Sequence, residues 1–424
     1  MARQLNALSI GPQAIASFQR AEQEHDNFRT ALSWGLANQH SQVVLKLLHD
    51  LFEFWLPAGY WPEGERWTAM AVDQASVLAE ARDEDSVYLS LALCQLGVFV
   101  ALQGRFPEAA PQTQRAYQMA RRLEEPWPLA FALQVRGQAL PDKEGALAAF
   151  EEAIAICQEK AGEPQFEARL GRLLRLYGDR LISFGMLIKA KAKYEESLAR
   201  FRKVGDTSEI AYPLGNLGRM ALHEGNLQQA HDLISESVTI ARNAGNRVAI
   251  GDWIFRLGQV QYYLGELDAA EANLQETMQL YEEVGNQFGP PGVLSNLALV
   301  ALERQNVELA VHLIQESLSR YHHLREAMYK VDRSAKFLEF GDTLESLLQA
   351  GLVAHALKEW ESAVGLFRFV EKNAPQYTAI QPLQKKVSAA EADMKTHLSP
   401  AAFAAATTKG ERLTLNELLA LWLQ

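Results

Sequence analysis

The chain has little of what reactive side-chain chemistry usually requires. Its 424 residues contain only two cysteines, Cys94 and Cys157, which lie far apart in apolar surroundings. Such a pair predicts buried free thiols, with a disulfide or a shared metal as the less favoured alternatives. The N-terminus lacks a continuous apolar run, so the sequence predicts no secretion signal and a cytoplasmic protein.

Motifs for catalysis and phosphate binding are also missing. The sequence has no Gly-x-x-x-x-Gly-Lys-Ser/Thr loop, no Gly-x-Ser-x-Gly elbow and no Cys-x-x-Cys pair. The dipeptide His223-Glu224 lacks the second histidine of a zinc protease, and the adjacent His322 and His323 point to different helix faces. We therefore predict no enzyme, no metal and no cofactor. An active site assembled from distant residues is kept as an alternative.

Positive charge is in the minority. The chain carries 41 basic and 52 acidic residues, a net charge of -11, which argues against a nucleic-acid surface. The basic stretch from Lys189 to Lys203 is interrupted by Glu195 and Glu196. We interpret it as a solvated helix face rather than a nucleic-acid contact.

One long segment, Ser86 to Gln103, has no charged residue, and its length alone would allow a membrane span. Gly97 within it, and Gly104 and Ala109 after it, follow the spacing of a repeat found further along the chain. We therefore predict a buried helix of that repeat, with a membrane span as the alternative.

What the sequence does contain is a repeat of forty residues, clearest between Gly171 and Arg325. Three sets of small residues mark it: Gly178, Gly218, Gly258 and Ala298; Ala190, Ala230, Ala270 and Ala310; Gly205, Gly245 and Gly285. The first set lets a neighbouring helix approach closely, and the third adopts the left-handed conformation that ends a helix. Each repeat is therefore predicted to be a helix pair, A and then B.

The start of helix B is predicted from a turn and an apolar period. After the turn at Gly225, Asn226 and Gln229 have the spacing of a capping box, which starts a helix near Leu227. The apolar positions that follow form one stripe: Leu227, Ala230, Leu233, Ile234, Val238 and Ala241. One pair cannot bury this stripe alone, so neighbouring pairs must stack.

These small residues, with a large residue four positions after the second set, resemble the tetratricopeptide repeat (TPR). The long period resembles the TPR region of MalT-like regulators. The resemblance implies an all-α fold, a right-handed TPR-like superhelical solenoid of about eight helix pairs.

Three parts are expected along the chain. Residues 1–85 form divergent helix pairs that cap the array, 86–325 form TPR repeats, and 326–424 form an extended helix, a last TPR-like pair and a C-terminal helical cap. After Ala310 the next matching residue is Ala363, so a helix that runs on to Phe337, or an extra turn, is predicted between them. The aromatic residues between Phe52 and Trp67 are interpreted as a stacking seal rather than a ligand cage.

Together with the forty-residue repeats, residues 24–34, 54–67, 362–367, 383–394, 398–406 and 410–419 resemble, in this order, the C-terminal half of bacterial signal-transduction ATPases of the STAND class. In that family the tail closes the TPR region, often before a LuxR-type DNA-binding domain. Because the sequence has neither the ATPase loop nor a helix-turn-helix tail, the resemblance implies a sensor or scaffold arm. An ATPase domain on a separate chain is a candidate partner.

TPR arrays of this kind bind ligands on the concave surface that their A helices line. With the first small residue counted as position eight, positions two, five, six, nine, twelve and thirteen are predicted to line the groove. They are Arg172, Arg175, Asp179, Tyr212, Asn216, Arg219, His223, Asp252, Phe255, Arg256, Gln259, Tyr262, Tyr263, Asn296 and Glu303. Arg, Asn and Tyr pair with carboxylates, peptide groups and rings, and for each residue an interhelix hydrogen bond is the alternative.

The sequence therefore predicts a non-catalytic interaction or sensor module in a bacterial signalling or transcription-regulatory system. Its partner is a protein, a peptide or a small inducer bound in the groove, with no direct nucleic-acid or membrane partner. The alternatives are a constitutive assembly scaffold that uses terminal or convex surfaces, and a cryptic enzyme.

Overall fold

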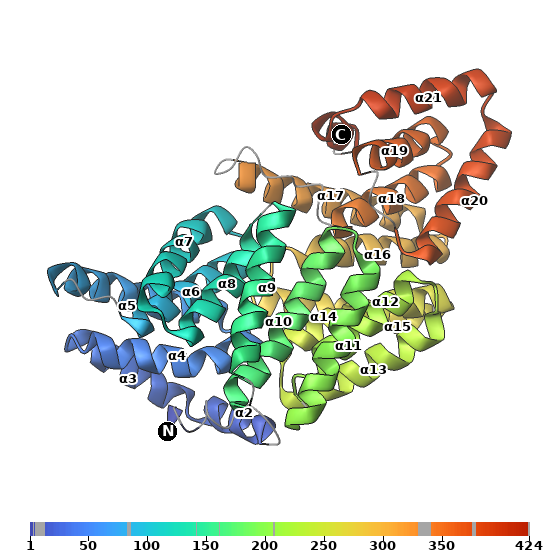
Figure 1. Cartoon of the computed structure of the whole chain (residues 1–424). Helices are drawn as coiled ribbons and strands as arrows, with labels where there is room; N and C mark the ends of the chain where they lie inside the picture. Colours follow the sequence, from blue (N-terminus) through green and yellow to red (C-terminus); the bar gives the residue numbers. More distant parts are fainter. Residues whose placement is uncertain are drawn as a thin grey trace. The chain divides into compact units, whose positions relative to one another are not determined.

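A computed structural model describes residues 1, 2, 4, 13–82, 86–140, 142–160, 162–206, 208–329, 341–374 and 379–422. This part of the chain forms helices and no strand (Figure 1). The helices are α2 (Ala14–Gln23), α3 (His25–Ala37), α4 (Ser41–Ala58), α5 (Trp61–Arg82), α6 (Val87–Leu102), α7 (Phe106–Leu123), α8 (Pro126–Ala139), α9 (Lys143–Glu159), α10 (Pro164–Ser183), α11 (Leu187–Val204), α12 (Ala211–His223), α13 (Leu227–Ala244), α14 (Arg247–Leu264), α15 (Leu267–Glu283), α16 (Gly289–Glu303), α17 (Val307–Tyr329), α18 (Gly341–Ala356), α19 (Trp360–Asn373), α20 (Gln381–His397), α21 (Pro400–Arg412) and α22 (Leu415–Trp422).

The helices from α4 to α19 form consecutive A and B pairs, from α4 with α5 to α18 with α19. Within a pair the two helices pack together, and successive A helices such as α4, α6 and α8 also touch. This is the all-α, TPR-like solenoid that the repeat predicts, and sixteen helices make eight pairs, as expected.

Contacts divide the chain into two compact units. Unit 1 comprises Met1–Leu217, Glu236–Ile250 and Glu283–Gly285; unit 2 comprises Gly218–Ser235, Gly251–Glu282 and Asn286–Gln424. Each unit is described by itself below. The division into three parts at residues 85 and 325 stays a prediction.

The first set of small residues brings A and B helices close together. A Cβ at Gly178 would lie 2.5 Å from the ring of Tyr194, and a Cβ at Gly218 would lie 2.6 Å from Cγ1 of Ile234. Both large side chains are fully buried, and each lies four residues after an alanine of the second set. The repeated spacing of small and large residues therefore reflects one contact, in which a large B-helix side chain packs directly on the backbone of the A helix at glycine.

A hydroxyl adds a second link to several pairs. Ser197, Ser237 and Ser317 donate to the backbone oxygens of Gly171, Ala211 and Pro291, at 2.7, 2.6 and 2.7 Å. These serines are buried, and they satisfy A-helix carbonyls from the facing B helix. Helix ends follow the prediction as well, because Gly205, Gly245 and Gly285 have φ values of 69°, 68° and 73°.

The uncharged segment forms α6, which is buried on nearly every side, so the predicted buried helix is confirmed. No described helix is long and apolar enough to cross a membrane. Cys94 and Cys157 are buried free thiols, as predicted. Burial raises the pKa of Cys94 to about 12 and that of Cys157 to about 11, so both stay protonated at neutral pH.

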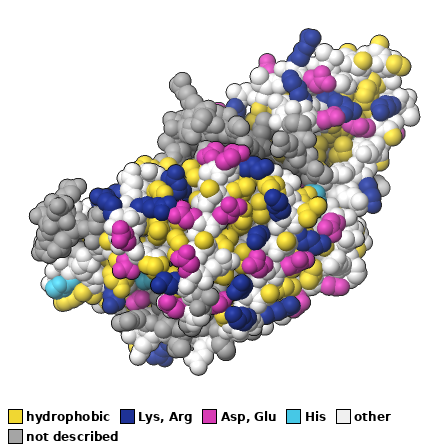
Figure 2. All heavy atoms as spheres, in the orientation of Figure 1, with side chains coloured by type: hydrophobic (Ala, Val, Ile, Leu, Met, Phe, Trp, Pro, Cys, Tyr) yellow, Lys and Arg dark blue, Asp and Glu magenta, His cyan; other side chains and the backbone are white. Residues whose placement is uncertain are grey.

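The basic stretch forms α11, and its cations have acidic partners. Lys193 pairs with Glu196 at 3.1 Å, and Arg200 and Lys203 both pair with Glu167, at 3.2 and 3.4 Å. On the face shown in Figure 2, basic and acidic side chains are interspersed. The stretch is thus an ion-paired helix face, in agreement with its interpretation from the sequence.

The C-terminal part of unit 2 departs from the forty-residue period. Helix α17 runs on through Tyr321 to Tyr329, as the spacing predicts; the remainder of the expected extension, to Phe337, lies outside the described residues. Further on, α21 packs on α19 through two glycines, where a Cβ at Gly410 would lie 2.6 Å from the backbone of Gly365.

The small-residue contact can be tested with two glycine-to-alanine changes. Gly178→Ala should lower the free energy of unfolding by about 1–3 kcal/mol, because the added methyl overpacks against the buried Tyr194 ring. Gly258→Ala should be nearly neutral, since its Cβ would meet Leu274 at 3.1 Å and the next repeat already carries Ala298. Urea unfolding of both variants measures the difference, and equal losses would contradict this explanation of the pattern.

Candidate functional site

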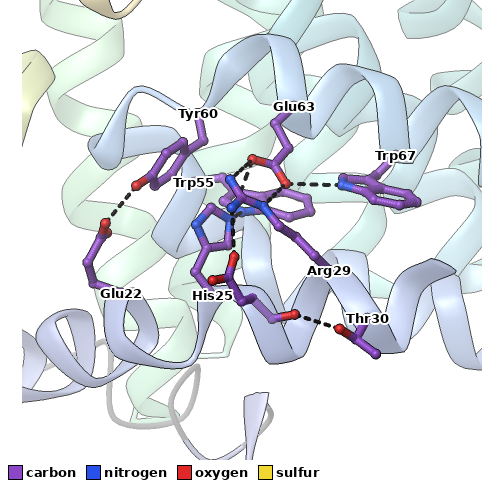
Figure 3. A network of polar contacts seen from close by, with 9 residues as sticks. Glu22, His25, Arg29, Thr30, Trp55, Tyr60, Glu63 and Trp67 are labelled. Atoms are coloured by element: carbon purple, nitrogen blue, oxygen red, sulfur yellow. Dashed lines mark hydrogen bonds and ion pairs between the residues drawn. The ribbon is translucent and has the colours of Figure 1, made fainter. Parts of the chain in front are cut away.

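The N-terminal helices of unit 1 are joined by a polar and aromatic network (Figure 3). Glu63 of α5 binds Arg29 of α3 through both carboxylate oxygens, at 2.7 and 2.6 Å, and also accepts from the indole of Trp67 at 3.2 Å. Trp55 of α4 donates to Nε2 of His25 at 3.0 Å, so neutral His25 carries its proton on Nδ1. Three helices are therefore fastened at one point.

The predicted aromatic seal lies around this network. Phe52, Phe54, Trp55 and Trp61 are all buried, and Tyr60 donates to Glu22 at 2.6 Å. Apart from Phe54, which also lines a cavity described below, these rings leave little surface for a ligand, so burial favours the seal over the ligand cage.

A second group of polar side chains follows the A helices of unit 1. Gln95 of α6 lies 3.4 Å from Nδ1 of His49 on α4, and Gln134 of α8 accepts from Arg169 of α10 at 3.1 Å. Gln95, Gln134 and Arg169 are buried, with exposed fractions of 1%, 7% and 4%. Polar groups in such positions cost free energy unless they are paired or serve a function.

Arg172 of α10 is the centre of this group. Its Nε donates to Glu209 at 3.1 Å, its Nη2 lies 2.9 Å from the same carboxylate, and its Nη1 donates to Glu53 of α4. Burial alone would raise the pKa of Glu53, but Arg172 and Arg169 outweigh it and the net pKa is lowered. Burial raises the pKa of Glu209, and Arg172 offsets only part of this effect. One cation is therefore shared by two carboxylates of different basicity.

A cavity of about 60 Å³ opens beside Arg172 within unit 1. Its polar lining consists of Ser17, Asp50, Glu53, Arg172, Ser208, Glu209 and Asn246. The opposite wall is apolar and comes largely from α2, where Phe18 packs edge-on against Phe54 with ring centroids 5.2 Å apart. This volume holds a few water molecules or one small polar group.

Unit 2 has its own row of polar A-helix residues. Gln259 of α14 lies 3.4 Å from Asn296 of α16 and 3.5 Å from Glu345 of α18. Nearby on α14, the hydroxyl of Tyr263 is buried and has no hydrogen-bond partner among the described residues. The amide of Gln349 on α18 is 1% exposed and likewise lacks a partner within the described ranges.

Helix α20 places a lysine against the same row. Lys386 pairs with Glu303 and lies 5.1 Å from the ring centroid of Tyr262, whose hydroxyl donates to Glu303 at 3.1 Å. The ammonium lowers the pKa of Glu303. Glu303 and the ring of Tyr262, both in this row, thus bind the basic side chain of Lys386.

The fifteen residues predicted from position counting fall into both units. Unit 1 holds Arg172, Arg175, Asp179, Tyr212 and Asn216; unit 2 holds Arg219, His223, Asp252, Phe255, Arg256, Gln259, Tyr262, Tyr263, Asn296 and Glu303. Their role as ligand contacts stays a prediction.

Some predicted residues contact each other, and others face the B helix. In unit 1 the guanidinium of Arg175 lies 4.5 Å from the Tyr212 ring centroid. In unit 2 Arg256 donates to Gln259 at 2.8 Å. Asp179 accepts from Tyr194 at 2.7 Å and Asp252 accepts from Tyr281 at 3.1 Å, so these two carboxylates link A to B helices.

Several residues of the two rows were not predicted. Counting from Gly97 and Gly137 would place Gln95 at position six and Gln134 at position five, and counting from Gly351 would place Glu345 at two and Gln349 at six. The same position count, applied to the less regular repeats, would therefore have predicted these four residues. Glu53, Arg169, Glu209 and Lys386 fall outside the counted positions, and only the folded chain brings them to the rows.

The comparisons with known proteins agree with this architecture. Residues 209–283 match the family model "Tetratricopeptide repeat". No curated protein matches the chain in sequence. A Rap protein solved in complex with Competence and Sporulation Factor is similar in structure, with a TM-score of 0.53 and 12% identity over 83% of this chain and 99% of that chain.

Two further structures share the helical architecture at lower similarity. Aspartyl phosphate phosphatase F from Bacillus subtilis has a TM-score of 0.49 and 11% identity, over 78% of this chain and 93% of that one. The STAND protein with a tetratricopeptide repeat sensor from Pyrococcus horikoshii has a TM-score of 0.46 and 14% identity, over 84% of this chain. This chain spans 55% of the length of that STAND protein.

The N-terminal network should make stability depend on pH. Burial lowers the pKa of His25 below its ordinary value of 6.5, although Glu63 opposes the shift. His25 therefore binds a proton more readily in the unfolded chain than in the folded chain. The free energy of unfolding falls as the pH drops below about 6.5. His25→Gln should reduce the loss of melting temperature between pH 7.5 and 5.5.

Two further variants complete this measurement. Burial also lowers the pKa of His49, so His25→Gln with His49→Gln should flatten the profile further. His312→Gln, at an exposed site, should leave the wild-type slope unchanged. If the double variant kept the wild-type slope, these histidines would not be the source of the acid sensitivity.

Proposed function

We propose that the chain is a non-catalytic interaction module that binds a peptide, or an extended protein segment, on the polar rows of its A helices. The observation that carries the proposal is the unused hydrogen-bonding capacity of buried groups, the Tyr263 hydroxyl and the Gln349 amide. A buried polar group without a partner costs about 1–3 kcal/mol, and a peptide backbone supplies both donors and acceptors.

The arrangement of the rows supports a peptide rather than a compact ligand. In each unit the polar residues lie on successive A helices, from α4 to α10 in unit 1 and from α14 to α18 in unit 2. An extended chain can contact several helices in turn, as small molecules cannot. The Rap protein of similar fold was solved in complex with Competence and Sporulation Factor, which is consistent with this use of the architecture.

The place of the module in the cell follows from the sequence resemblance. We propose that it is the sensor arm of a bacterial signalling or transcription-regulatory system that includes a signal-transduction ATPase. Ligand binding would then be passed on through small changes in the stacking of helix pairs.

Two tyrosine-to-phenylalanine changes separate binding from folding. A heptapeptide is first selected on the wild-type chain by phage display, and its dissociation constant is measured by calorimetry. Tyr263→Phe should weaken binding at least fivefold without loss of melting temperature, because the hydroxyl has no partner to lose within the described structure.

The matched control is Tyr281→Phe. Its hydroxyl donates to Asp252, so this variant should lose about 0.5–1.5 kcal/mol of stability and leave affinity unchanged. Failure to select any peptide, or equal affinity in wild type and Tyr263→Phe, would overturn the proposal for this row.

A further inference from the structure

The cavity beside Arg172 has two chemically different walls. One is formed largely by α2 and Phe54 and is apolar except for Ser17. The other carries the carboxylates of Glu53 and Glu209, with side-chain exposures of 16% and 17%. A group that fits both walls needs a polar head and an apolar stem.

The charges on the polar wall do not balance. Arg172 directs Nε and Nη2 to Glu209 and Nη1 to Glu53, so one guanidinium serves two carboxylates. Asp206, which is fully buried and accepts from the backbone N–H of Glu209 at 3.2 Å, adds a further acidic group behind this pair. Asp50, Glu53 and Glu209 line the cavity together with Arg172, so the lining carries more negative than positive charge, which favours a second cation there.

Two further guanidinium groups act on these carboxylates without lining the cavity: Arg175 lowers the pKa of Glu209, and Arg169 lowers that of Glu53. Arg169 donates to Gln134 and stacks on the rings of Trp127 and Phe131, at 4.5 and 4.6 Å from their centroids. It forms no ion pair within the described part of the chain. Its guanidinium is thus held between α8 and α10 and does not line the cavity, although its charge helps to lower the pKa of Glu53.

We infer that this cavity receives the guanidinium or ammonium group of a basic residue in a peptide ligand, with Glu209 as its principal partner. This inference rests on the proposed peptide-binding function and names the chemistry of one recognised side chain. The stem of the basic residue packs along Phe18 and Phe54 of the apolar wall, as long cationic side chains do elsewhere.

Two observations support the assignment. Burial raises the pKa of Glu209, and the charges of Asp206 and Glu53 add to the shift while Arg172 and Arg175 oppose it, so a further cation beside Glu209 would favour its charged form. In unit 2 the chain binds a basic side chain of its own in the same manner, where Lys386 lies between Glu303 and the ring of Tyr262. A cation held by a carboxylate and an aromatic ring is favourable in partly buried sites.

The test is a double-mutant cycle between the peptide and Glu209. Heptapeptides are selected in parallel on the full wild-type chain and on Glu209→Gln. On the wild type, Arg or Lys should be enriched at one position. Replacing that residue by citrulline or norleucine should weaken binding at least tenfold on the wild type and less than threefold on Glu209→Gln.

Controls separate this inference from the proposed function and from misfolding. Glu159→Gln removes an exposed carboxylate outside the cavity lining and should behave as wild type. Glu209→Gln keeps an oxygen that accepts from Arg172, and its melting curve reports whether it folds.

The outcomes are distinct. Loss of the basic preference in Glu209→Gln alone supports the cation site. Selected peptides without a basic preference, or a citrulline effect that persists in folded Glu209→Gln, would overturn the cation site while leaving peptide binding intact. Selection of no peptide at all would overturn both the cation site and the proposed peptide binding. If Glu209→Gln does not melt cooperatively, Glu53→Gln takes its place, and the basic preference and the citrulline effect are measured on that variant instead.

Discussion

The fold depends on the contact between a large B-helix side chain and a bare stretch of A-helix backbone. At Gly178 and Gly218 the facing Tyr194 and Ile234 occupy the space that a Cβ would need. Because the contact recurs every forty residues, it sets the separation of the two helices in each pair, and the apolar stripe of one pair is then covered by the next. Hydroxyls such as Ser197 and Ser237 fix the same helices along their length.

Because the small A-helix residues and the large B-helix residues hold each pair together, other A-helix positions can carry polar groups. Gln134 and Arg169 in unit 1, and Gln259 and Asn296 in unit 2, are buried although none contributes apolar surface. A solenoid built for stability alone would place hydrophobic residues there. The proposed binding role draws on these buried amide and guanidinium groups.

The sequence predicts the pairs well because the repeat combines a period, a turn and a helix end in one pattern. Gly205 and Gly245 adopt the left-handed conformation expected of them, and α13 begins at Leu227. The candidate site was only partly predictable. Arg172 is reached by counting, whereas Glu53 lies 119 residues away along the chain and meets Arg172 only after the helices stack. Contacts of this range leave no local pattern.

The glycine pair of the C-terminal helices has a consequence for alignment. Gly410 of α21 lies so close to the backbone of Gly365 on α19 that a methyl group would not fit. A slip of α21 by one turn would bring Ala406 or Leu413 to that point, and both carry a Cβ. The two glycines therefore allow one register of α21 on α19 and exclude the registers shifted by one helical turn.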